Sequence, residues 1–238
     1  MAKTLVAIVQ TAALELGLNA PVSVVGNGDA QTQQMLALAN RTGVELSQTE
    51  GGWQALRGEQ LITWVVGQDT YTLPIDYLYY VQDTQWNRSS HYRIDGPMSA
   101  LDWETIKSGL YPSGVYSRYR IFGNKIVFDP IPSDTSTIAI EYISNSWCQS
   151  AAAIGQISFL ADTDTPRIPD DLFVLGVKWR FLAAKGFDYS EERAAYDMAL
   201  NRFHPRDTVT ENISLGMRGG INTFLNMGLL PAGNWPGR

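Results

Sequence analysis

Hydrophobic residues recur at helical spacing in the first fifty residues of the chain. Between Thr4 and about Leu18 the apolar positions fall on one helical face, and Pro21 follows the end of this pattern. A second stripe begins after Asp29, whose carboxylate can accept hydrogen bonds from the free amides of a first helical turn. It ends near Gln48. The pattern therefore predicts two amphipathic helices.

From about Leu56 the period of the hydrophobic residues changes to two, and aromatic and β-branched residues become dense. Between two of the resulting runs, Gly123-Asn124 is typical of a two-residue hairpin turn, because both residues tolerate positive φ. We therefore expect a mostly antiparallel sheet. Its strands are Leu61–Val66, Thr70–Leu73, Tyr77–Trp86, Tyr116–Phe122, Lys125–Phe128 and Thr137–Ile143.

The last of these strands indicates a sheet with one buried face. Successive side chains of a strand point to opposite faces, so alternate positions share an environment. Ile138, Ile140 and Tyr142 should face the core. The outward set is Thr137, Ala139 and Glu141.

Helical spacing returns after Pro169, a favoured first helical residue, and Gly186 is a candidate C-cap. A fourth helix should begin at Asp188 or Ser190 and end at Pro205. The expected inward residues are Leu172, Leu175, Trp179 and Leu182 in the third helix, and Tyr196, Ala199, Leu200 and Phe203 in the fourth.

The remainder of the chain, from Thr208 to Arg238, mixes apolar residues with many glycines and keeps neither period for long. It is too apolar for a solvated tail and too rich in glycine for a clear helix. We expect an extended C-terminal arm that packs on a neighbouring subunit or partner, with packing on its own body as the alternative. The expected partner-binding residues are Ile213, Leu215, Met217, Ile221, Phe224, Leu225, Leu229, Leu230 and Trp235.

These elements predict an α+β fold in which a discontinuous helical bundle carries an inserted, mostly antiparallel β-domain. The helical domain comprises residues 1–56 and 150–204, and the β-rich insert comprises residues 57–149. The extended arm comprises residues 205–238.

Charge and composition exclude several classes of function. The formal net charge is -6, so the chain has no cationic excess with which to neutralise phosphates, and DNA near it should pass rather than bind. A single cysteine, Cys148, excludes an intramolecular disulfide and suits a reducing compartment. No apolar window reaches the roughly 18 residues of a membrane span, and the N-terminal apolar stretch is too short for a signal peptide. We expect a protein of the host cytoplasm or of a particle assembled there.

Candidate chemistry is sparse, and we expect no enzyme and no cofactor. The two histidines, His91 and His204, lie in no catalytic signature. The acidic cluster of Asp162, Asp164, Asp170 and Asp171 is the best metal candidate, because hard cations prefer carboxylate oxygens. It lacks the glycine and distal glutamate of a calcium-binding helical loop, and a polar connection into the following helix explains it better. We therefore expect no metal site.

Tyrosine and tryptophan are abundant between Trp53 and Trp103. Such rings can stack on sugars or bases, which leaves a carbohydrate-binding module open as an alternative function. We favour the interpretation that they form a small β core and subunit interfaces.

Two motifs resemble a known family. Residues 67–77, with Leu73, Pro74 and Asp76, resemble the strand, Leu-Pro-x-Asp, strand element of the head-to-tail adaptors, or tail tubular A-like proteins, of short-tailed phages. Residues 119–132 resemble that family's hairpin and its Pro-x-Pro exit. The hairpin and exit residues are Gly123, Asn124, Pro130 and Pro132.

The resemblance implies a structural connector that docks as a homo-oligomeric ring, twelve-membered in that family, beneath the phage portal protein. Such a ring extends the DNA channel and presents a platform for the tail nozzle or a tail fibre protein. DNA would pass through its lumen without specific binding, and the protein would lie in the virion at the portal vertex. The family has no catalytic residues to transfer to this chain.

Overall fold

The computed structural model describes residues 3–109 and 117–207, and residues 1–208 form one compact unit. Within the described residues the fold is α+β, as predicted, with helices at both ends of that range and antiparallel sheets between them. The proposed domain limits stay a prediction. The region assigned to the extended arm lies outside the described residues from Thr208 onward.

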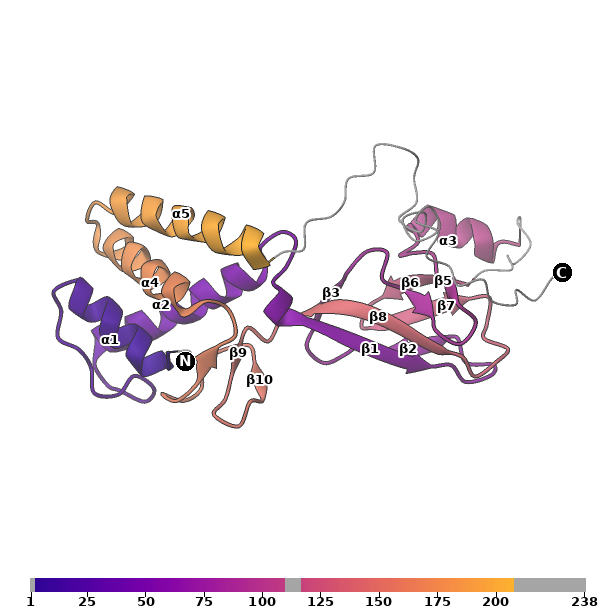
Figure 1. Ribbon diagram of the computed structural model, residues 1–238, viewed down its shortest axis with the longest axis horizontal. Coiled ribbons are helices and arrows are strands. Elements are labelled where there is room, and N and C mark those ends of the chain that lie inside the picture. Colours follow the sequence, from indigo (N-terminus) through magenta and orange to yellow (C-terminus); the bar gives the residue numbers. More distant parts are fainter. Residues whose placement is uncertain (1–2, 110–116, 208–238) are drawn as a thin grey trace, which may run out of the picture. The chain divides into compact units, whose positions relative to one another are not determined.

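Four helices form the helical part, and all four were predicted. They are α1 (Leu5–Glu15), α2 (Ala30–Ser47), α4 (Asp170–Lys185) and α5 (Ser190–Asp207). Helix α4 contacts each of the other three (Figure 1). The bundle therefore joins the two ends of the described chain.

The helix ends follow the expected capping chemistry. Thr4 caps α1, and the Asp29 carboxylate accepts from the Thr32 amide at the start of α2. Gly186 ends α4 in the left-handed conformation, with φ of 77°. The boundary at Pro169 is shifted by one residue, because it is the N-cap of α4 rather than its first residue.

One expectation for the later helices was wrong. Pro205 lies inside α5, which continues to Asp207, since a proline near the end of a helix removes only one amide donor. In α4 the buried positions cover most of the circumference, because three helices pack around it. Of the four inward residues expected, Leu172 is buried, Leu175 and Trp179 pack against the core, and Leu182 is half-buried. In α5 the expected face is confirmed, with Tyr196 and Ala199 buried and Leu200 and Phe203 packed against the core.

The main sheet has the order β1-β8-β4-β5, and β3 also pairs with β8. A second sheet has the order β2-β7-β6. The strands of the main sheet are β1 (Arg57–Thr63), β3 (Tyr77–Tyr80), β4 (Trp86–Asn87), β5 (Tyr92–Arg93) and β8 (Thr137–Ser144). Those of the second are β2 (Thr70–Thr72), β6 (Arg118–Phe122) and β7 (Lys125–Asp129). All of these strand pairs are antiparallel (Figure 1).

A second hydrophobic core lies between these sheets. It combines residues of the main sheet, such as Ile138 and Ile140, with residues of the second sheet, such as Ile126 and Phe128. The helical core is separate, although it includes Ile143 near the end of β8. The strand β8 therefore contributes to both cores.

The strand predictions hold in outline and fail at particular places. The first strand begins at Arg57 and ends at Thr63, and the expected strand from Tyr77 to Trp86 is two strands, β3 and β4. Ala139 is buried rather than outward-facing, because this small side chain lies between its larger cross-strand neighbours Leu61 and Trp86. Tyr142 is half-buried.

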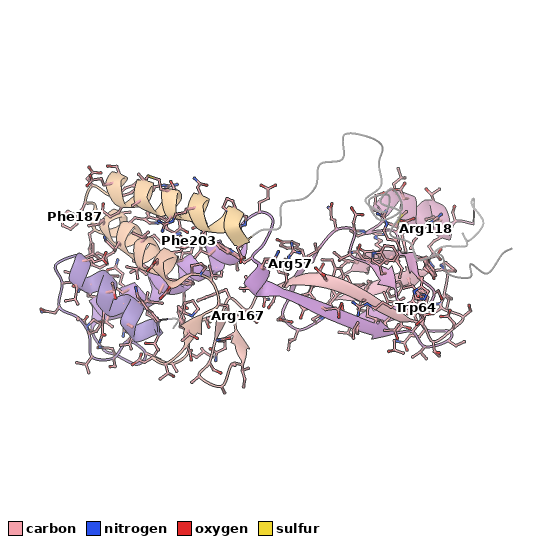
Figure 2. The ribbon with its side chains drawn as sticks, viewed as in Figure 1. Arg57, Trp64, Arg118, Arg167, Phe187 and Phe203 are labelled. Atoms are coloured by element: carbon pink, nitrogen blue, oxygen red, sulfur yellow. The ribbon has the colours of Figure 1, made fainter. Side chains whose placement is uncertain are left out.

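Several short elements were not predicted. They are the 3-10 turn η1 (Gln54–Leu56), helix α3 (Ala100–Lys107), and a small sheet of β9 (Cys148–Gln149), β10 (Gly155–Gln156) and β11 (Thr165–Pro166). The small sheet connects β8 to α4. Arg167 follows β11 and donates hydrogen bonds to the carbonyls of Ser146 and Ala55 (Figure 2).

Candidate functional site

The two motifs singled out in the sequence meet in space. The hairpin turn at Gly123-Asn124 is confirmed, with φ of 60° at Gly123, and it joins β6 to β7. The amide of Leu73, at the end of β2, donates to the Asn124 carbonyl over 3.2 Å. Leu73 itself is buried in the core between the sheets. This hydrogen bond therefore joins the Leu-Pro-x-Asp element, which follows β2, to the turn between β6 and β7.

Asp76 ties the same element to the end of β8. Its carboxylate accepts hydrogen bonds from the Tyr142 hydroxyl (3.0 Å) and the Ser144 hydroxyl (2.6 Å). The backbone carbonyl of Asp76 accepts from the Asn145 amide. The turn around Pro74 is completed by a bond from the Tyr77 amide to the Pro74 carbonyl. These roles are structural, because the Asp76 carboxylate and the carbonyls of Pro74 and Asp76 accept hydrogen bonds from the protein itself.

The Pro-x-Pro exit lies beside the loop that follows β1. The Gly67 amide donates to the Pro132 carbonyl, and three large apolar side chains near this contact are exposed. They are Val65, Val66 and Ile131, each more than half exposed. We call this group the loop patch.

The outer face of the main sheet carries a row of cross-strand neighbours. Trp86 of β4, Ala139 of β8 and Leu61 of β1 lie opposite one another in the register. Leu61 is 56% exposed and Trp86 is 37% exposed. A concavity of ≈ 480 Å³ borders this row. Its lining includes Glu59, Asp83, Trp86, Arg88, His91 and Glu141.

The charges beside this row are compensated in pairs. Glu59 and Glu141 are directly opposite in the register, an arrangement that is unfavourable between like charges. Arg88 pairs with Glu59, and Arg57 approaches Glu141 at 3.5 Å. The carboxylates of the outer face are therefore balanced by arginines, in exposed ion pairs that are worth little individually.

Most of the aromatic residues between Trp53 and Trp103 belong to the interior. Trp53, Trp64, Tyr80 and Trp103 are buried, whereas Trp86 is the exposed tryptophan among the described residues. Burial raises the pKa of Tyr80, so its phenol stays neutral at physiological pH. The aromatic residues thus contribute mainly to the cores, as favoured from the sequence.

The acidic cluster that was considered for a metal serves backbone groups instead. The Asp162 carboxylate accepts from the amides of Val24 and Val25, and the buried Asp164 carboxylate accepts from Leu160 and Ala161. Asp170 and Asp171 lie in the first turn of α4 and bind Lys3, through its amide and its ammonium group respectively. Among the described residues no group of three or more His, Cys, Asp or Glu side chains is arranged to hold a metal ion.

The remaining candidates for chemistry also occupy structural positions. Cys148 is fully buried, and burial raises the pKa of its thiol to about 12. His91 lies in the turn between β4 and β5 with φ of 59°. The ring of His204, on α5, meets the ring of Trp53 edge-on at 5.1 Å between centroids. No described helix is long and apolar enough to span a membrane.

Arg180 is a buried charge that sequence reasoning missed. It donates to Thr42 and to the Gly176 carbonyl, and it forms an ion pair with Glu45 of α2. Its guanidinium group also lies over the Trp179 ring, 4.3 Å from the centroid. The residue therefore joins α4 to α2. The signal was an arginine between apolar residues of a predicted helix.

The partner-binding residues predicted in the arm, from Ile213 to Trp235, lie outside the described residues. They stay a prediction. The other exposed apolar side chains of the described chain include Ile75, Phe122, Ile154, Ile157, Leu160, Phe187 and Met198. Phe187 lies in the connection between α4 and α5 (Figure 2).

A comparison with protein-family models identifies the family of the chain. The model of the SU10 adaptor protein family matches residues 3–214, which covers every helix and strand described above. The chain belongs to the SU10 adaptor protein family. As a phage adaptor, it is a structural component of a virion. No curated protein matches the chain.

The two motifs act together as a structural element of the β-rich region. In this SU10-family adaptor the Leu-Pro-x-Asp element and the hairpin form one hydrogen-bonded unit, which holds the second sheet against the main sheet. Among the described residues, surfaces open to other molecules include the loop patch, the outer face of the main sheet and the edge of that sheet at β1. The period of the strand residues predicted an outward face of the sheet. It did not predict that β1 lies at the edge of the sheet, because local patterns do not record the order of strands.

Proposed function

We propose that this adaptor is the subunit of a head-to-tail connector of the tail tubular A-like type. Twelve copies would form a ring between the phage portal protein and the tail nozzle or a tail fibre protein, and the ring would extend the DNA channel. The family match over residues 3–214 carries the proposal, because it shows an adaptor over the whole described fold.

The surfaces of the chain support a role in assembly. The loop patch and the outer face of the main sheet expose large apolar side chains beside compensated charges, a combination typical of interfaces that form after folding. In the proposed ring the helical bundle forms the wall, and the sheets face the next tail component. The arm, with residues Ile213 to Trp235, contacts a neighbouring subunit or partner.

The charge of the chain fits a conduit that does not retain DNA. With a formal net charge of -6 per copy, an acidic ring repels phosphates at long range. We expect no shift of duplex DNA in a gel-mobility experiment at physiological salt. A shift that weakens steeply with added salt would instead indicate a cationic surface on the assembled ring.

Association with the portal tests the proposal. The purified chain is mixed with the portal protein of the same phage and measured by mass photometry, with and without residues 208–238. We expect a complex that contains about twelve chains, and a loss of binding or of ring closure on removal of the arm. A chain that stays at its monomer mass beside the portal contradicts the proposal.

A further inference from the structure

One edge of the main sheet is open along the whole of β1. Among residues 3–109 and 117–207, the strand pairs only with β8, and the Trp64 amide donates to the Ser136 carbonyl in the same register. Because hydrogen-bonded pairs alternate in an antiparallel ladder, Ile62 and Gln60 direct their backbone groups toward β8. The amides and carbonyls of Glu59, Leu61 and Thr63 therefore point away from the sheet.

The opposite side of β8 confirms this alternation. There the Val81 amide donates to the Glu141 carbonyl and the Arg88 amide donates to the Thr137 carbonyl, so the odd-numbered residues of β8 face away from β1. Within the described part of the chain, no hydrogen bond engages the backbone groups of Glu59, Leu61 or Thr63. An open ladder of three residues remains on β1.

The edge has few of the features by which proteins usually prevent strand addition. It contains neither lysine nor proline, and it is a regular strand of seven residues. Leu61, at its centre, is 56% exposed, and the charge of Glu59 is compensated by Arg88. Such an edge is suited to accept another strand.

Two side-chain donors lie at the beginning of the edge. The side-chain Nε2 of Gln54 and the Nε of Arg57 are buried and have no hydrogen-bond partner. Both residues line a concavity of ≈ 300 Å³ at the start of β1, together with Gly58, Glu59 and Glu141 (Arg57 is labelled in Figure 2). Both atoms are covered by the protein itself, so the open edge rests on the outward backbone groups of Glu59, Leu61 and Thr63.

The sequence supplies a suitable strand just beyond the described helices. Helix α5 ends at Asp207. In residues 208–215, polar side chains at the even positions alternate with odd positions that are apolar or, at Glu211, acidic. The even positions are Thr208, Thr210, Asn212 and Ser214, and three of the odd positions are Val209, Ile213 and Leu215. This is the period of a strand that buries one face.

We propose that Thr208–Leu215 of one copy adds as an antiparallel strand to the free edge of β1 in the next copy. The inference rests on the proposed ring, and it gives the arm a defined target, which is a second copy of this chain. Arm and edge are different surfaces, so the contact is heterologous and repeats around a closed ring. Backbone hydrogen bonds provide the affinity, as in other cases of strand addition.

The position of Asp207 favours exchange between copies. Its carboxylate accepts from the Gln54 amide, which lies at the start of β1. A strand that leaves this point within the same copy would run parallel to β1, and parallel pairing is slightly less stable. An antiparallel strand would instead enter at Thr63, the other end of β1. At about 3.3 Å per residue, this end lies roughly 20 Å from Arg57, and a neighbouring copy can supply the strand there.

A proline at the centre of the edge tests the backbone contact. The Leu61 amide points away from β8, so Leu61→Pro removes an outward donor and leaves the β1–β8 ladder intact. We expect self-association, measured by mass photometry, to weaken about tenfold or more. The matched control Leu61→Thr shortens the side chain but keeps the amide, and it should retain association. Equal association of the proline variant and the wild type contradicts the inference.

Disulfide trapping in the full-length chain gives a result that does not depend on the folding of the proline variant. Leu61→Cys is combined in turn with a cysteine at Val209, Glu211, Ile213 or Leu215, and oxidised chains are separated without reductant. The native Cys148 is buried and does not compete. We expect a ladder of covalent multimers for at least one pair. The control pair of Met198→Cys, an exposed position on α5, with Ile213→Cys should give none.

The possible outcomes separate this inference from the proposed function. Cross-links within single chains, or no cross-links in complexes that form normally with the portal, overturn the strand exchange and leave the connector role intact. A covalent ladder from a chain that never binds the portal supports the exchange and removes the connector role.

Discussion

Two glycines set how closely the elements of the helical part approach. A Cβ atom on Gly43 of α2 would lie 2.4 Å from the Trp147 ring, and one on Gly176 of α4 would lie 2.4 Å from the Thr42 side chain. No real Cβ atom tolerates such distances to a packed ring. At the residue scale, the packing of the helical part therefore depends on the missing side chains of these two glycines.

Gly43→Ala should destabilise the fold by forcing the Trp147 ring aside in a closely packed core. We expect the free energy of unfolding to fall by about 1–3 kcal/mol, measured by urea denaturation. The control is Gly28→Ala, since a Cβ atom at Gly28 meets nothing within 4 Å. Its effect should stay within about 0.5 kcal/mol. Equal stability of the two variants would contradict the packing described for Trp147.

Cys148 should be inert in the folded protein. Burial raises the pKa of its thiol to about 12, so at pH 8 only about one molecule in 10,000 carries the reactive thiolate. A chromogenic disulfide reagent should therefore react with one thiol per chain only after denaturation. Rapid modification under native conditions would show that the small sheet around Cys148 opens readily.

Single residues were predictable where local chemistry decides their role. The cap at Asp29 and the left-handed end at Gly186 follow from side-chain and backbone preferences within a few residues. Ala139 and Arg180 were not predictable in the same way. The burial of each depends on neighbours far along the chain, namely Leu61 and Trp86 for Ala139, and α2 for Arg180.

At the scale of elements, the hairpin of β6 and β7 links the second sheet to the Leu-Pro-x-Asp element. Its turn requires positive φ at Gly123, where a β-branched side chain is strained. The strain would also disturb the bond between Leu73 and Asn124. The turn is therefore a sensitive point of the β-rich region.

Gly123→Val should lower the free energy of unfolding by about 1–2 kcal/mol, because of the cost of a Cβ atom in the left-handed region. Gly123→Asn is the control, since asparagine tolerates this conformation and should cost much less. Thermal denaturation followed by circular dichroism measures both variants. A valine variant as stable as the asparagine variant would show that the turn adopts another conformation.

Long elements with a clear period could be predicted, and short ones could not. The four helices of the bundle and the strands β6, β7 and β8 are long or regular enough for side-chain spacing to show them, and the three-residue β2 was marked by the Leu-Pro-x-Asp motif that follows it. Helix α3 has eight residues in a region of dense aromatic residues, and β9, β10 and β11 have two residues each. Their formation depends on tertiary contacts, which periodicity does not record.

At the scale of the whole molecule, the side chains that were candidates for metal binding or catalysis have structural roles within the described residues. The aspartates bind backbone amides and Lys3, the cysteine is buried, and the motifs hold the two sheets together. The exposed apolar groups and the free edge of β1 are left for other chains. The candidate site was only partly predictable, because strand order and the exposure of loops arise from the complete fold.

Cryo-electron microscopy of the purified virion tests the connector role most directly. We expect a ring of about twelve copies of this fold between the portal and the next tail component, with the DNA channel continuing through it. Density for the fold at any other place in the particle, or its absence from the portal vertex, would rule out the connector role.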